Sequence, residues 1–79
     1  MDLIDNTPIR QAFLERDVDW GMLCVRLGTT EAESSRFKRQ LGIIPETNHG
    51  RTAIRQRITY ECAVRLCRAA GFDPVDMGL

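Results

Sequence analysis

Apolar residues recur at intervals of three and four between positions 20 and 27, the spacing of one face of a helix. The stripe consists of Trp20, Leu23, Cys24 and Leu27. Gly28 follows it directly and favours a helix end, because glycine accepts a positive φ. The pattern therefore predicts a helix over residues 20–27, with Asp17 or Asp19 as its cap.

A second helix is predicted at about residues 31–41. Thr30 and Glu33 have the spacing of a capping box, and Phe37 and Leu41 form an apolar pair that can pack on the first helix. The polar side chains of this stretch lie off the face formed by this apolar pair, and they are Ser34, Ser35, Arg36, Lys38, Arg39 and Gln40. A striped helix, a turn with glycine and a helix with a cationic face are typical of a helix-turn-helix. Two ordinary amphipathic helices with a solvated basic face would give the same pattern.

A further helix is predicted before this pair, over residues 7–16. Thr7 is a suitable cap and Pro8 suits the first helical position. The apolar face of this helix consists of Ile9, Ala12, Phe13 and Leu14. Residues 1–6 are expected to fray, although the apolar side chains among them can tuck onto the core.

The last long helix is predicted after Thr59, which caps it, and before Gly71, which ends it. Its apolar face consists of Tyr60, Ala63, Val64, Cys67 and Ala70. Pro74 then begins a short helical turn that extends to Met77.

Residues 43–57 show no clear period. Ile43 and Ile44 precede a proline, which predicts a short extended piece, and residues 46–51 predict an exposed turn. Residues 52–58 fit an extended, a helical or a mobile segment. Pairing of Ile43 and Ile44 with that segment would make a small wing. The expected fold is all-α: a single domain over residues 1–79 with four to five helices, a helix-turn-helix, and a loop or short β-wing at residues 43–57.

Composition excludes several protein classes. The chain has 79 residues, 43% of them hydrophobic and 28% charged, which is typical of one small folded domain with little room for an enclosed active site. No apolar run approaches the roughly 20 residues of a membrane span. The acidic N-terminus is unlike a signal peptide, so we expect a cytoplasmic protein without a membrane partner.

The residues that could carry chemistry favour neither an enzyme nor a metalloprotein. His49, the one histidine, lies in a predicted turn without a nucleophile at a suitable spacing. The cysteines at 24, 62 and 67 are odd in number and contain no Cys-x-x-Cys. Together with His49 they would supply four zinc ligands, but their spacing fits no common zinc pattern, and buried free thiols are the simpler expectation. We predict no catalytic residue, metal or cofactor.

Charge is divided unevenly along a chain whose net charge is zero. Residues 1–33 hold three arginines against seven acidic residues, whereas residues 34–70 hold eight basic residues against two glutamates. Seven of those eight are arginines, which suit bidentate contacts with phosphate and guanine. The segregation predicts one cationic face, although a dipolar surface that only aids solubility would have the same composition.

These patterns predict double-stranded DNA as the partner. The helix at about 31–41 would enter the major groove, with Ser34, Ser35, Arg36, Lys38, Arg39 and Gln40 as candidates for base edges and flanking phosphates. Arg51, Arg55 and Arg57 would add contacts to the phosphate backbone. One module of this size covers one half-site, which favours a homodimer or a protein partner. The alternative is a protein-interaction module that docks on a host or partner protein without DNA, which the acidic first third favours modestly.

Three stretches carry a family resemblance. They are Thr-Pro-Ile-Arg at residues 7–10, Asp-Trp-x-x-Leu-Cys-x-Arg-Leu-Gly at 19–28 with Ser-Ser-Arg-Phe-Lys-Arg-Gln-Leu-Gly at 34–42, and residues 57–79. With these, the chain resembles helix-turn-helix proteins of actinobacteria and their bacteriophages. The segment 45–55 is unmatched, and the turn at 29–34 departs from the usual spacing. The resemblance implies a small transcription regulator, with repressor, Cro-like and excisionase-type roles all open.

Overall fold

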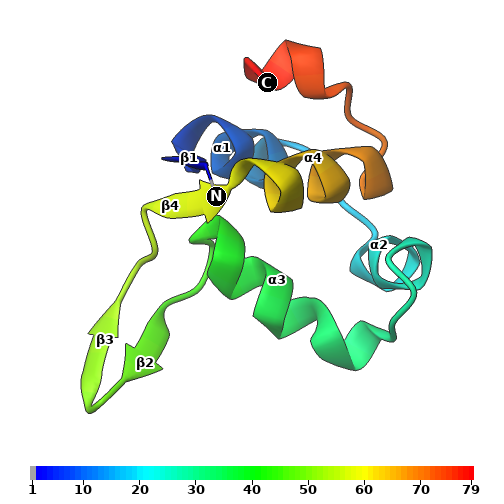
Figure 1. Ribbon diagram of the computed structural model, residues 1–79. Helices are drawn as coiled ribbons and strands as arrows, with labels where there is room; N and C mark the ends of the chain where they lie inside the picture. Colours follow the sequence, from blue (N-terminus) through cyan, green and yellow to red (C-terminus); the bar gives the residue numbers. More distant parts are fainter. Residues whose placement is uncertain (1) are drawn as a thin grey trace.

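Helices and short strands alternate along the chain. The computed structural model describes residues 2–79, and Figure 1 shows its main elements. In order, these are β1 (Leu3–Asp5), α1 (Thr7–Glu15), α2 (Trp20–Arg26), α3 (Ser34–Leu41), β2 (Glu46–Asn48), β3 (Arg51–Ala53), β4 (Arg57–Thr59) and α4 (Tyr60–Ala69). Two 3-10 turns, η1 (Glu31–Glu33) and η2 (Pro74–Met77), precede α3 and follow α4.

The expected all-α class is wrong. Helices hold 53% of the chain and two small antiparallel sheets hold 15%, so the fold is mixed α/β. The first sheet pairs β1 with β4, with Ile4 opposite Ile58. The segment that was expected to fray is therefore a strand from Leu3 to Asp5. Its partner lies more than fifty positions away, which no local pattern of residues can indicate.

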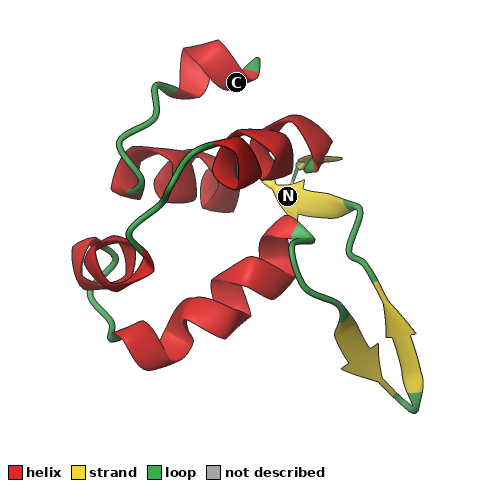
Figure 2. Cartoon of the chain, turned by 180° about the vertical axis from the view of Figure 1, so that it is seen from behind, coloured by secondary structure: helices red, strands yellow, loops and turns green. Residues whose placement is uncertain are grey.

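The second sheet is a hairpin of β2 and β3. Its two-residue loop consists of His49 and Gly50, whose φ angles of 53° and 75° are both positive, as a type I′ turn requires. The expected wing strand at Ile43 and Ile44 is wrong, because the hairpin begins at Glu46. The expected exposed turn at residues 46–51 is the hairpin itself. Seen from behind in Figure 2, the hairpin projects away from the helices.

The hydrophobic core lies among the four helices. The largest apolar side chains that are fully buried in it are Ile9, Leu23, Cys24, Leu41, Leu66 and Cys67. Phe13 packs edge-on against Phe72, with ring centroids 4.9 Å apart, and lies 5.7 Å from the ring of Trp20. Ile58 extends the core to β4. No helix in residues 2–79 combines the length and apolar character needed to cross a bilayer.

The helix ends agree in part with the predicted caps. The Asp19 carboxylate accepts a hydrogen bond from the Met22 N–H, and the Thr59 hydroxyl accepts one from the Cys62 N–H. The expected capping box at Thr30 is wrong: Thr30 precedes η1 without a side-chain cap, and the Glu33 carboxylate lies 3.4 Å from Arg36 instead. The expected cap at Thr7 is also wrong, because Thr7 is the first helical residue and Asn6 precedes it.

Candidate nucleic-acid interface

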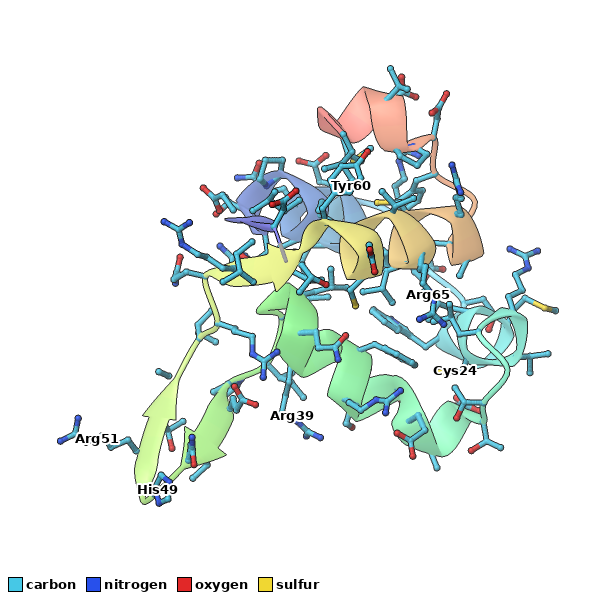
Figure 3. The ribbon with its side chains drawn as sticks, viewed as in Figure 1. Cys24, Arg39, His49, Arg51, Tyr60 and Arg65 are labelled. Atoms are coloured by element: carbon cyan, nitrogen blue, oxygen red, sulfur yellow. The ribbon has the colours of Figure 1, made fainter. Side chains whose placement is uncertain are left out.

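The outward face of α3 carries two of its three cations. Phe37 and Leu41 are buried on the inner face. At 3.6 residues per turn, Ser35, Arg36 and Arg39 then lie on the opposite side of the helix. Ser35 and Arg36 are exposed and Arg39 is half-buried. Figure 3 shows Arg39 extending from the side of α3 that faces away from α4.

The other predicted residues of α3 lie on its flanks. The Lys38 ammonium lies 5.2 Å from the centre of the Trp20 ring, a cation–π contact with α2. The Gln40 side-chain oxygen accepts a hydrogen bond from the Cys62 thiol of α4 at 3.1 Å. Ser34 is half-buried at the first position of the helix. Lys38 and Gln40 therefore already have partners within the protein.

A second group of cations lies on the hairpin and on the chain that follows it. Arg51 begins β3 and points outward near the far end of the hairpin in Figure 3. Arg55 follows β3 and holds the Glu46 carboxylate through two hydrogen bonds, of 3.0 and 2.7 Å. These bonds lower the pKa of Glu46. Arg57 lies apart from the hairpin, in β4 opposite Asp5.

The buried side chain of Asn6 ties the hairpin to α3. This residue is 0% exposed. Its amide nitrogen donates to the carbonyl of Arg55 at 2.8 Å and to that of Gln40 at 3.3 Å. Its amide oxygen accepts a hydrogen bond from the Arg10 guanidinium at 3.3 Å. One side chain therefore holds the end of α3 and the chain that leaves the hairpin.

Gly42 completes this junction. Its φ is 78°, and a Cβ at this position would lie 2.5 Å from the guanidinium nitrogen Nη1 of Arg10 and 2.6 Å from the carbonyl oxygen of Arg55. Glycine is therefore required both by the backbone conformation and by the close approach of neighbouring atoms. The chain turns here from α3 into the hairpin with no room for a side chain.

Sequence analysis missed Asn6 because residues 1–6 were expected to fray. The available signal was an asparagine directly before Thr7 and Pro8, which is a common position for a helix cap. Its contacts with residues 40 and 55 depend on tertiary structure, so the sequence pattern gives no sign of them.

Ion pairs leave several cations of this surface unneutralised. In the part of the chain that the structure describes, the ion pairs are Arg36–Glu33 at 3.4 Å and Arg55–Glu46 at 2.7 Å. Arg39 and Arg51 have no carboxylate within 4.0 Å among these residues. They are therefore the members of the predicted set, on α3 and the hairpin, that are most available to an anion.

His49 and the three cysteines, the other residues considered for chemistry, do not form a metal site. Within residues 2–79 no group of three or more metal-binding side chains comes together. His49 lies exposed at the hairpin loop, Cys24 and Cys67 are buried, and Cys62 is half-buried. Burial raises the pKa of all three thiols.

Comparison of the chain with protein-family models, with curated proteins and with solved structures finds no match. The resemblance to helix-turn-helix regulators therefore stays a prediction from the sequence.

Proposed function

We propose that the protein binds double-stranded DNA through α3 and the β2–β3 hairpin. The observation that carries the proposal is the pairing of a helix whose outward face bears Arg36 and Arg39 with an exposed hairpin that bears Arg51. An α-helix is about 10–12 Å wide with its side chains, and the major groove of B-DNA is about 12 Å wide. Insertion of α3 would leave the hairpin beside it to reach the flanking backbone.

The residues divide into two roles under this proposal. Ser35, Arg36 and Arg39 face outward and are the candidates for base edges. Ser34, Lys38 and Gln40 lie on the flanks of α3 and serve phosphates at the edge of the groove, once Lys38 and Gln40 leave their present partners. Arg51, Arg55 and Arg57 contact the phosphate backbone.

The salt dependence of binding follows from the number of cations. If all six arginine and lysine side chains of this set met phosphates, the log–log slope of affinity against salt would be about −5. If Arg36 and Arg55 kept their carboxylates, four would remain and the slope would be about −3.6. A small transcription regulator of bacterial or phage origin, acting as a dimer or with a protein partner, is the biological role that this activity would serve.

The test is a titration of the purified protein with a fluorescent duplex of random sequence, from about 50 to about 200 mM salt. We expect measurable binding and a slope between the two values above. Arg39→Ala should weaken binding at every salt concentration and reduce the slope by about 0.9, because on a duplex of random sequence, without its specific base pairs, Arg39 would contact a phosphate. The matched control is Arg68→Ala, which removes the same charge from α4 and should leave both quantities unchanged.

Two results would overturn the proposal. One is the absence of DNA retention at the lowest salt, which would favour a protein-interaction module. The other is an equal effect of Arg39→Ala and Arg68→Ala, which would mean that net charge alone governs binding. Circular dichroism spectra of both variants would exclude loss of folding as the cause.

A further inference from the structure

A second cationic surface lies between α4 and the α2–α3 pair. Two hollows, of about 180 and 350 Å³, share Leu27 and Arg65 among their lining residues and so adjoin one another. We refer to them together as the α4 groove, which is bordered by Arg26, Leu27, Arg36, Arg65, Leu66 and Arg68. None of the residues assigned to the DNA-binding surface lines it except Arg36 and Gln40, at its α3 edge.

The α4 groove gathers positive charge without balancing carboxylates. Four arginines border it, and no aspartate or glutamate lines either hollow. Of these, Arg36 alone takes part in an ion pair among the described residues, with Glu33. Like charges around one groove repel, so this arrangement favours a bound anion that would offset the repulsion. The Arg26 guanidinium donates to the carbonyl of Ala69 at 3.0 Å, which holds one of these cations at the mouth of the groove.

The smaller hollow has a mixed lining, in which Leu27, Phe37 and Leu66 supply the apolar part. Leu27 is half-buried there, and the nearly buried side chains of Phe37 and Leu66 lie beneath. Its volume of about 180 Å³ corresponds to roughly six water molecules. Displacement of this water by one aliphatic side chain would add a hydrophobic contribution to the electrostatic one.

We propose that the α4 groove binds an acidic peptide segment of a protein partner. Its carboxylates would pair with Arg65, Arg68 and Arg26, and one aliphatic side chain would enter the hollow above Leu66. Guanidinium groups suit carboxylates because they can bind them through two parallel hydrogen bonds. The apolar part of the lining favours a peptide over a phosphate backbone, which has no aliphatic group to place against Leu27 and Leu66.

The position of the groove also separates it from the DNA-binding surface. In Figure 3, Arg65 lies on the α4 side of α3, whereas Arg39 extends from the opposite side. A duplex on the outward face of α3 would be kept from Arg65 by the width of a helix, about 10 Å. Arg36 and Gln40 border both surfaces, but the three arginines proposed to pair with the peptide are not among the candidate DNA-binding residues. The peptide site therefore does not depend on the proposed DNA binding.

The test uses the full chain and a fluorescent peptide of about twelve residues, composed of aspartate and glutamate with one central leucine. Binding is measured by anisotropy for the unmodified protein and for the double variant Arg65→Glu/Arg68→Glu. The matched control is Arg39→Glu/Arg51→Glu, which makes the same change of charge on the proposed DNA surface. We expect the groove variant to lose at least about tenfold in peptide affinity and the control less than about twofold. DNA retention should follow the opposite pattern.

Two companion measurements separate the contribution of charge from that of the aliphatic side chain of the peptide. Arg65→Gln/Arg68→Gln should have an intermediate effect, and a peptide with glycine in place of leucine should bind more weakly than the parent. The proposal is overturned if the peptide fails to bind, if both charge-reversed variants lose equal affinity, or if the glycine peptide binds as well as the parent. A loss of DNA retention in the groove variant, with peptide binding intact, would assign the groove to DNA phosphates instead.

Discussion

Replacement of Asn6 by alanine should destabilise the whole domain. The Asn6 side chain is 0% exposed and makes three hydrogen bonds, to Gln40, Arg55 and Arg10. A hydrogen bond contributes about 0.5–1.5 kcal/mol net, and a buried polar group left without a partner costs about 1–3 kcal/mol. Loss of this side chain removes the Asn6 donor from both carbonyl oxygens, and that of Arg55 keeps only the long hydrogen bond of 3.5 Å from the Arg10 guanidinium. The expected loss of stability is therefore about 2–4 kcal/mol.

That loss is large for a protein of this size. Marginal stability of about 0.05–0.15 kcal/mol per residue gives roughly 4–12 kcal/mol for 79 residues. Urea unfolding followed by the fluorescence of Trp20 would measure the change as a fall in the transition midpoint at constant slope. The matched control is Asn48→Ala, the same substitution on an exposed strand of the hairpin, which should change the stability by less than about 0.5 kcal/mol.

A second substitution isolates the donated hydrogen bonds. Asn6→Asp preserves the shape of the side chain, but the ionised carboxylate has no N–H to give to the carbonyls of Gln40 and Arg55. We expect it to destabilise the protein, despite the proximity of the Arg10 guanidinium. If Asn6→Ala lost no more than Asn48→Ala, water would be able to satisfy the two carbonyls, and the inference that Asn6 fixes the hairpin would be refuted.

Two further predictions concern the hairpin and its junction with α3. Gly42→Ala should destabilise the protein more than Gly28→Ala. Both glycines have φ near +78°, which costs alanine about 1–2 kcal/mol, but of the two only Gly42 has neighbouring atoms with which a Cβ would collide. Equal urea midpoints for the two variants would contradict this prediction. The hydrogen bonds from Arg55 hold the pKa of Glu46 below its ordinary value of 4.5. The Arg55–Glu46 pair therefore stabilises the protein fully above pH 4.5, and this stabilisation is lost as the pH falls through the pKa of Glu46 in the folded protein. An NMR titration should show a lower midpoint for the Glu46 carboxyl than in an Arg55→Gln variant, and equal midpoints would refute the role of the pair.

The helices were predictable because their signals are local. The three-and-four spacing before Gly28 and the single side-chain caps at Asp19 and Thr59 each act within one turn of the chain, and the structure has helices at these places. The capping box at Thr30 failed because Glu33 has a competing partner, Arg36, one turn further along α3. A spacing rule cannot decide between two partners at similar distances.

The strands were missed for a different reason. Each has three residues, too few for an alternating pattern to appear, and β1 pairs with a segment more than fifty positions away. The loop of His49 and Gly50 predicts only a turn, because the residue before glycine in a type I′ hairpin loop is usually Asn, Asp or Gly. The sequence pattern therefore gives no sign of the β1–β4 sheet and leaves the hairpin as one alternative within residues 43–57, so the predicted class of the fold is wrong.

Only the part of the candidate site that lies on α3 can be predicted from the sequence. The outward position of Arg36 and Arg39 follows from the period of α3, once Phe37 and Leu41 are taken as buried. The partners of Lys38, Gln40 and Arg55 were not predictable, because they come from α2, α4 and β2. Tertiary contacts therefore distinguish residues that the sequence presented as equivalent members of one cationic set.

The same contacts indicate which residues position the two parts of the proposed interface relative to each other. The angle between α3 and the hairpin is fixed by Asn6, Arg10 and Gly42, none of which belongs to the candidate DNA-binding residues. A duplex that contacts both elements requires that angle to be constant, because a misplaced hairpin would lose its phosphate contacts without any change in its own residues. The buried polar junction, formed largely by the N-terminal segment, would thus govern affinity as much as the exposed arginines do.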